Sequence, residues 1–361
     1  MRTIDFNTNE DIYIISDIHG GIKEFKKLLG YVKANSKLII LGDIIEKGEY
    51  SLDTLEYIME LDKLDNVYVL KGNNEAAVVN VFNDDFLHFF INRMNNKKSL
   101  IYQMLDRQNL VGNPKELQEN LRLIYQKHIN WMNNLEVMLE TDDFIFVHAG
   151  IDNIPDYHNS HIKSFTNLTN FYFQGHQANK TVICGHYPAA IFRLDRMDDS
   201  ILIDHNKKII CLDGGFGTKT YGQMNMLKIS KTKKGYNYHT YEVDDFETIE
   251  IVKAQKAMGN LRGICYPNYQ LEFIEEELYF TKAINSDGEK VFVKNEFVVF
   301  QNDHYYASDD IPNNLLKVVV GDIVKLLSNK TKGYALVKKD GVSGWVAYEC
   351  LPKIKEEVES V

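Results

Sequence analysis

The sequence lacks several features that would place the protein in a particular class. Its four cysteines are scattered, with no Cys-x-x-Cys pair and no zinc-type spacing. No apolar run approaches the ~20 residues that span a bilayer, and the amino terminus lacks the apolar core of a signal peptide. The formal net charge of −10 disfavours loose binding to nucleic-acid backbones or anionic membranes. We therefore expect a cytoplasmic protein without a membrane or nucleic-acid partner.

The chain has enough apolar residues for more than one packed core. It contains 361 residues, of which 44% are hydrophobic. The first part alternates predicted strands at 12–15, 37–41 and 67–70 with predicted helices at 22–32 and 52–61. This βαβαβ pattern favours parallel strands with right-handed crossovers.

The rest of the chain changes character twice. Residues 76–138 have helical spacing and form a predicted insertion, a possible cap over a pocket, and strands return at 144–147, 181–184, 209–212 and 224–229. Beyond a polar stretch, 251–267, short strand-like segments dominate, and Asp340-Gly341 between two alternating runs predicts a hairpin. We expect an α/β fold, a β-sandwich of two mixed sheets flanked by helices. A small all-β domain with a charged tail follows it.

Six short segments with metal-binding residue types follow apolar strand-like runs, where open α/β sheets place their ligand sites. A lone Asp-x-His, Gly-Asp or Gly-His is common by chance, but six in order after strands are not. His176 is a rival to His186, but it lies in a polar turn. The segments are Ser16-Asp17-Ile18-His19-Gly20, Gly42-Asp43, Gly72-Asn73-Asn74-Glu75, His148-Ala149-Gly150, Gly185-His186 and Asp213-Gly214-Gly215.

The residue types in these segments suit a centre of two divalent metals. Asp17 and His19 lie two residues apart, so their side chains can point to the same side. Asp43 follows the next strand and can bridge two metals, and the amide oxygen of Asn73 is an acceptable hard ligand. Two metals ~3.5–4 Å apart would polarise a phosphoryl group and lower the pKa of a bridging water. His148 and His186 complete the candidate set.

Residues from about 11 to 229 resemble the calcineurin-like metallophosphoesterases, in particular their bacterial phosphoprotein-phosphatase branch. The resemblance implies that Asp17 and His19 hold the first metal, that Asp43 bridges, and that Asn73, His148 and His186 hold the second. The change in sequence character predicts a catalytic domain over 1–250, a linker over 251–267 and a β-barrel-like domain over 268–361. The last hairpin of that domain resembles bacterial Src-homology-3-like barrels. The usual metals are manganese, iron or zinc.

The chain departs from the family motifs at three positions. The family's Gly-Asp-x-x-Asp-Arg-Gly has Glu46 and Lys47 here, and its Gly-Asn-His-Glu has Asn74. In the family that histidine is proposed to protonate the leaving oxygen, and the arginine grips the phosphate. An amide cannot deliver a proton near neutral pH, and lysine offers a point charge instead of a bidentate fork. We expect Asp43, Glu46, Lys47 and Asn74 to be catalytic residues, with Lys47 and Asn74 also binding substrate.

These departures leave three hypotheses for the function. The first is a phosphomonoesterase that resembles bacterial Ser/Thr protein phosphatases, with another proton donor such as Glu46 or His205. The second is a phosphodiesterase or nucleotide hydrolase, and the third is a catalytically weak scaffold that binds phosphorylated ligands. Arg193 or Arg196 could replace a missing phosphate-binding arginine. The expected partners are a phosphoprotein or small phosphoester and, for the C-terminal domain, a peptide or partner protein.

Overall fold

The computed structural model describes residues 2–82, 86–193 and 195–353. The chain forms two compact units, each with its own core. The first comprises Met1–Ala189 and Ser200–Asp244, and the second comprises Ala190–Asp199 and Asp245–Val361. Within the described ranges, no helix combines the length and apolar character that crossing a membrane requires.

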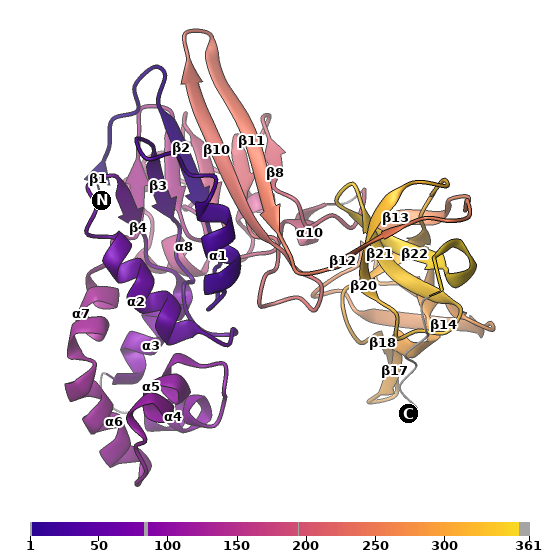
Figure 1. Cartoon of the computed structure of the whole chain (residues 1–361), viewed down its shortest axis with the longest axis horizontal. Coiled ribbons are helices and arrows are strands. Elements are labelled where there is room, and N and C mark those ends of the chain that lie inside the picture. Colours follow the sequence, from indigo (N-terminus) through magenta and orange to yellow (C-terminus); the bar gives the residue numbers. More distant parts are fainter. Residues whose placement is uncertain (1, 83–85, 194, 354–361) are drawn as a thin grey trace. The chain divides into compact units, whose positions relative to one another are not determined.

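A five-stranded sheet contains the alternating part of the chain, in the strand order β11-β10-β2-β3-β4 (Figure 1). Strands β2, β3 and β4 are parallel, and helices α1 and α2 connect them, so the predicted βαβαβ unit is confirmed. Strand β10 joins the sheet antiparallel to β2. The bounds are β2 Asp11–Ile15, α1 Ile22–Leu29, β3 Lys37–Ile40, α2 Ser51–Leu61, β4 Val67–Val69, β10 Met224–Thr232 and β11 Gly235–Val243.

A six-stranded sheet in the order β1-β5-β6-β7-β9-β8 forms the other half of the sandwich. Strands β6, β7 and β9 are parallel, whereas β5 and β8 pair antiparallel with their neighbours β6 and β9. Both sheets are therefore mixed, as predicted. The bounds are β1 Arg2–Thr3, β5 Met138–Glu140, β6 Phe144–Val147, β7 Thr181–Cys184, β8 Leu202–Asp204 and β9 Ile209–Cys211.

Alternating side chains of β2 contribute to two cores. Ile12 and Ile14 lie in the core that also contains Phe146 of the other sheet. Tyr13 and Ile15 lie in the core that contains the apolar residues of α1 and α2. The period of two along a strand thus explains why β2 is apolar from residue 12 to residue 15, because both of its faces are covered.

The predicted helical insertion consists of α3 Asn73–Phe82, α4 Leu87–Met94, α5 Leu100–Gln108, α6 Pro114–Ile124 and α7 Gln126–Asn134. Two of its helices begin with side-chain caps, since Ser99 accepts a hydrogen bond from the backbone N–H of Tyr102 and Asn113 accepts one from that of Glu116. Shorter helices follow at α8 Ile162–Asn167, α9 Phe171–Gln174 and α10 Ala189–Phe192, with 3-10 turns at Tyr157–Asn159, Asn295–Phe297 and Tyr348–Cys350.

The second unit is rich in β-strands, as predicted for the C-terminal domain. One sheet has the order β12-β20-β21-β22-β19-β13, and the other has the order β16-β15-β14-β18-β17. The predicted hairpin turn is present, with φ of 51° at Asp340 and 82° at Gly341. The bounds are β12 Glu247–Glu250, β13 Met258–Ile264, β14 Gln270–Glu276, β15 Phe280–Asn285, β16 Lys290–Lys294, β17 Val298–Gln301, β18 His304–Ala307, β19 Ile311–Leu315, β20 Ile323–Ser328, β21 Tyr334–Lys339 and β22 Val342–Ala347.

The boundary of this unit differs from the predicted one. The units divide near residue 244 instead of 250, because β12 pairs with β20 and buries Ile249 in the second core. The predicted linker 251–267 contains β13, which pairs with β19. Strand β13 lies at the edge of its sheet, and its polar sequence lacks the apolar pattern that would predict a strand. Of the predicted tail 353–361, all but Lys353 lies outside the described residues.

Candidate metal centre

The backbone turns sharply where the metal-type residues follow their strands. Asp17, His19, Asp43 and His186 have φ of 54°, 46°, 51° and 69°. Residues other than glycine rarely adopt this left-handed conformation, which costs of order 1–3 kcal/mol per residue. Four of the six predicted ligands share it, so the surrounding structure holds these side chains in place against their local preference.

Hydrogen bonds between the loops after β2 and β3 hold this conformation. The backbone N–H groups of Asp17 and His19 donate to the carbonyls of Gly42 and Asp43, at 3.2 and 2.9 Å. On the other sheet, the N–H of His186 donates to Oδ2 of Asp17 at 3.0 Å. The ligand loops of the two sheets therefore fix one another.

Glu75 organises the loop that contains Asp43, a role that the sequence analysis missed. Its fully buried carboxylate accepts hydrogen bonds from the backbone N–H groups of Asp43, Ile44 and Gly72, at 2.9, 2.9 and 2.8 Å. Burial and the nearby Asp43 carboxylate raise the pKa of Glu75. An acidic residue in the first turn of a helix was the one signal that pointed to such a role.

Close packing at Gly185 brings the two sheets together at the site. A Cβ atom on Gly185 would lie 1.9 Å from Oγ of Ser16 and 2.2 Å from Oδ2 of Asp17. Only glycine fits there, which explains the Gly-His pattern before His186.

Two histidines have a defined tautomer that leaves a lone pair facing the site. Nδ1 of His19 lies 3.2 Å from the carbonyl oxygen of Ile45, and Nδ1 of His148 lies 3.0 Å from that of Leu41. A carbonyl oxygen only accepts, so each Nδ1 carries a hydrogen, and in the neutral form of each ring Nε2 has the lone pair. Burial and the neighbouring His148 lower the pKa of His186 to about 4, so its ring is neutral at neutral pH.

The structure brings the predicted ligands together in two overlapping groups. Potential ligand atoms of Asp17, His19 and Asp43 lie within 4.8 Å of one another, and so do those of Asp43, His148 and His186. Asp43 belongs to both groups, which is the position a bridging carboxylate requires.

The terminal amide atom of Asn73 lies among the acceptors of the second group. It is 2.9 Å from Nδ1 of His186, 3.0 Å from Nε2 of His148 and 3.1 and 3.3 Å from the oxygens of Asp43. As an NH₂ group it would donate to these atoms, and as an oxygen it completes a converging set of lone pairs. The second arrangement is the one that a divalent cation requires.

Unsatisfied buried atoms show that the residues fit divalent cations. Oδ1 of Asp17 and Nε2 of His186 are buried and make no hydrogen bond with the residues that the structure describes. Asp17, Asp43 and Asp213 are 2%, 1% and 2% exposed, and such buried carboxylates are costly unless cations compensate them. Oxygen and imidazole donors suit manganese, iron or zinc equally.

Asn74 is bound to the bridging carboxylate. Its backbone N–H donates to Oδ1 of Asp43 at 2.9 Å, and its side-chain Nδ2 donates to Oδ2 at 2.6 Å. Both oxygens of Asp43 therefore accept from Asn74. In this structure Asn74 orients Asp43, which is a positioning role.

Glu46 and Lys47 point in different directions from the same loop. Nζ of the exposed Lys47 lies 3.2 Å from Nε2 of His19, so its positive charge lies at the site. The buried Glu46 instead accepts a hydrogen bond from the backbone N–H of Leu100 at 3.0 Å and lies 3.8 Å from Nε of Arg93. Glu46 therefore contacts the helical insertion.

The other candidate residues lie elsewhere. His205 is exposed in the turn between β8 and β9, at the end of β9 opposite to Asp213. Arg193 and Arg196 belong to the second unit and both contact Asp198, so neither is a free phosphate ligand. His176 contacts the carbonyl oxygen of Lys208 and is in neither ligand group.

Asp213 is a second buried acid that the predicted site omitted. Its Oδ1 accepts from the backbone N–H of Gly215 at 2.7 Å, and its Oδ2 has no hydrogen-bond partner among the described residues. Burial and the Asp17 carboxylate raise the pKa of Asp213. The only sequence signal for Asp213 is that it lies in one of the six segments with metal-binding residue types.

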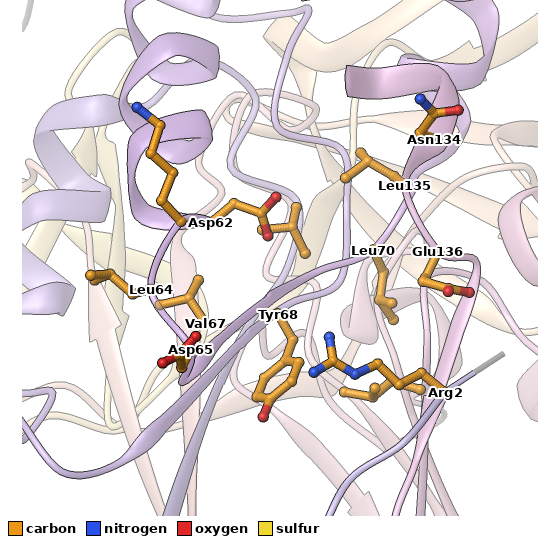
Figure 2. Close-up of a pocket in the computed structure, with 13 residues that line it drawn as sticks. Arg2, Asp62, Leu64, Asp65, Val67, Tyr68, Leu70, Asn134, Leu135 and Glu136 are labelled. Carbon is orange, nitrogen blue, oxygen red and sulfur yellow. The ribbon is translucent and has the colours of Figure 1, made fainter. Parts of the chain in front are cut away.

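A separate cavity of about 400 Å³ lies beside the edge strands β4 and β1 (Figure 2). Arg2 and Asp62 line it, and the guanidinium of Arg2 lies 5.0 Å from the centre of the Tyr68 ring. None of the predicted metal ligands lines this cavity, so it is distinct from the metal centre.

Comparisons with known proteins agree with the geometry. A family model described as "Calcineurin-like phosphoesterase" matches residues 11–212. The chain is similar to the symmetrical bis(5'-nucleosyl)-tetraphosphatases of Buchnera aphidicola subsp. Schizaphis graminum, with 31% identity over 146 residues, and of Haemophilus ducreyi, with 28% over 144. These matches cover 39% and 38% of this chain and 44% of each relative, less than half the length of these curated relatives.

A likeness to a solved structure covers a larger part of the chain. A protein serine/threonine phosphatase from Saccharomyces cerevisiae superposes with a TM-score of 0.41 and 12% identity, over 68% of this chain and 84% of that one.

Proposed function

This chain belongs to the calcineurin-like phosphoesterase family, and we propose that it is a two-metal-dependent phosphoester hydrolase that prefers nucleotide phosphoanhydrides, such as dinucleoside polyphosphates. One observation supports this substrate class above all. Asn74 stands where the family has a histidine that is proposed to act as an acid, and the amide of Asn74 is bound to Asp43. The names of the two similar bacterial enzymes agree with this class.

The residues at the strand ends would hold two cations. Asp17, His19 and Asp43 suit the first, and Asp43, Asn73, His148 and His186 suit the second. Bound divalent cations supply Lewis acidity to the phosphoryl group and favour an ionised water as the nucleophile.

The chain's own residues prepare the site for an anionic substrate. Asn74 and Glu75 fix the side chain and the backbone of Asp43, so that the bridging carboxylate need not reorganise. The backbone carbonyls of Ile45 and Leu41 hold the imidazoles of His19 and His148 with their lone pairs toward the site. The ammonium group of Lys47 lies beside Nε2 of His19, and its positive charge there favours an anionic phosphoryl group.

A phosphoanhydride tolerates a missing proton donor. The loss of a general acid typically costs ~10²–10⁴-fold in rate, and most of that cost falls on poor leaving groups. An alkoxide leaving group is strongly basic and needs a proton. The phosphate group of a leaving nucleotide has its last pKa at about 6, so it departs as an anion. The absence of a histidine at position 74 therefore penalises alkyl phosphomonoesters far more than anhydrides.

The predicted phosphomonoesterase activity stays a prediction. Its replacement acids have poor support, because Glu46 is bound to Leu100 and Arg93, and His205 lies at the far end of β9. The predicted scaffold, which binds phosphorylated ligands without turnover, would need the same metal ligands. Turnover assays with a panel of phosphate substrates test it as well. A cytoplasmic location and the phosphoprotein-phosphatase branch also stay predictions.

The C-terminal domain has its own proposed role. The Gly344-Trp345-Val346 segment of β22 lies in the final hairpin and supports the predicted Src-homology-3-like region, for which we propose a peptide or protein partner.

A substrate panel tests the proposed function. Metal-loaded protein is assayed with a dinucleoside tetraphosphate, an aryl phosphodiester, an aryl phosphomonoester and an alkyl phosphomonoester, and products are separated by ion-exchange chromatography. We expect the anhydride to be cleaved at least ~10²-fold faster than the alkyl monoester. Equal or faster cleavage of the alkyl monoester would overturn the proposed substrate class. No turnover of any substrate, with two metals bound, would support the scaffold.

A further inference from the structure

The helical insertion contains a stretch with positive charges only. The residues from Phe86 to Leu105 include Arg93, Lys97 and Lys98 and no Asp or Glu. The whole chain has a formal net charge of −10, whereas this stretch is positive. Lys97 and Lys98 are exposed in the turn between α4 and α5, and Arg93 lies in the last turn of α4.

This turn packs directly against the loop that follows the bridging residue Asp43. Oγ of Ser51 donates to the carbonyl oxygen of Lys98 at 3.4 Å, and Nε2 of Gln103 donates to the carbonyl oxygen of Gly48 at 3.2 Å. The same loop contains Lys47, which contacts His19. The basic turn and the metal ligands are therefore connected through a few residues, and helices α4 and α5 lie next to one another (Figure 1).

Arg93 retains hydrogen-bonding capacity beside this loop. Its side chain is 21% exposed, and its Nε lies 3.8 Å from Oε2 of Glu46, which is too far for a hydrogen bond. Nε makes no hydrogen bond with the residues that the structure describes. A guanidinium has five N–H donors in a planar fork that matches phosphate oxygens. A single ion pair as long as the one with Glu46 does not use up this hydrogen-bonding capacity.

We propose that Arg93, together with Lys97 and Lys98, forms a subsite for the phosphate groups of a polyphosphate substrate that lie beyond the one attacked. This inference rests on the proposed function, since an anhydride substrate brings additional phosphates and a simple phosphoester does not. Such a subsite would help an acidic protein to attract a polyanion, because its positive charges belong to a turn that packs against the loop after Asp43. Lys47 then faces the attacked phosphoryl group, and the basic turn faces the rest of the chain of phosphates.

The structural alternative is that Arg93 only neutralises the buried carboxylate of Glu46. Under that alternative, removal of Arg93 lowers stability and leaves the discrimination between phosphate chain lengths unchanged. The test must therefore compare a long and a short phosphate ligand on the same variant. Binding is measured instead of turnover, so that the outcome does not depend on whether the ligand is hydrolysed.

Binding of inorganic tripolyphosphate and orthophosphate to the full-length protein is measured by titration calorimetry. The same excess of manganese is present throughout, so that chelation by the probe is equal for every variant. The variants are Arg93→Gln and the double variant Lys97→Gln/Lys98→Gln, whose side chains are exposed and whose replacement leaves the core intact. Arg122→Gln is the matched control, since Arg122 is an exposed arginine of the same insertion on α6.

We expect Arg93→Gln to weaken tripolyphosphate binding by about 10-fold or more and the double lysine variant by about 3- to 10-fold. Orthophosphate binding should change by less than about 2-fold, and Arg122→Gln should change neither ligand. An equal loss for both ligands, or no loss for tripolyphosphate in either variant, overturns the subsite. Failure of the proposed function appears separately, as a wild-type protein that binds tripolyphosphate but does not cleave a dinucleoside tetraphosphate.

Discussion

The metal side and the substrate side of the candidate site are built in different ways. The metal ligands follow strands of the two sheets, and backbone hydrogen bonds fix them in turned conformations. The substrate side consists of the loop around Glu46 and Lys47 and of the helical insertion with Arg93. Two of the three departures from the family motifs, Glu46 and Lys47, lie on the substrate side, and the third, Asn74, contacts the bridging carboxylate of Asp43. The comparison indicates that all residue types suited to hold two metals are present, whereas positions 46, 47 and 74 differ from the family motifs.

The largest expected effect comes from breaking the metal side at its shared residue. Asp43→Asn removes the charge that serves both ligand groups. Because the metals supply several kcal/mol of transition-state stabilisation, we expect hydrolysis of an activated aryl phosphate to fall by ~10³-fold or more. Elemental analysis should show fewer bound metals per chain.

Asp65→Asn is the control for Asp43→Asn, since Asp65 is an exposed acid of the same unit and is in neither ligand group. Unchanged hydrolysis in Asp43→Asn would show that the two-metal assignment is wrong.

The second variant changes a residue that departs from the family motif and also donates a hydrogen bond to Asp43. Asn74→His restores the family's residue, and we expect turnover of an alkyl phosphomonoester to rise on the order of 10²-fold. Turnover of an anhydride should change little, because its leaving group needs no proton. An Asn74→His protein with no gain on the alkyl substrate would count against the missing-acid argument.

The third variant tests how the backbone supports the metal side. Glu75→Gln keeps the shape of the side chain but removes the charge that holds the N–H groups of Asp43, Ile44 and Gly72. We expect metal affinity to fall ~10- to 100-fold, as for other partners that orient ligands. Competition with a chelator measures this change. Wild-type affinity would mean that the turned backbone is stable without Glu75.

The smallest expected effect comes from the point charge on the substrate side. Lys47→Gln should raise KM for an aryl phosphodiester by about 10-fold, as expected for the loss of one charge-assisted hydrogen bond. Metal content should stay at the wild-type value, which separates this variant from Asp43→Asn. A fall in metal content would instead assign Lys47 to the support of His19.

The sequence could indicate which side chains come together on the metal side because each candidate ligand lies at a strand end. Strand-like runs and their order locate Asp17, Asp43 and His148 without any knowledge of contacts. The hydrogen bonds of Glu75 with Asp43 and Ile44 and the pairing of Arg93 with Glu46 join residues about 30 or more positions apart, so spacing could not reveal them. The linker prediction failed for a related reason, since the edge strand β13 is polar and becomes evident only through its pairing with β19.

The dependence of rate on the leaving group tests the central claim most directly. A series of aryl phosphodiesters with leaving-group pKa values from ~4 to ~10 is assayed with the metal-loaded wild-type protein. Without a proton donor the leaving oxygen departs as an anion, so the logarithm of kcat/KM should fall steeply as the leaving-group pKa rises. A flat dependence would show that the site protonates the leaving group, and it would contradict the account of Asn74.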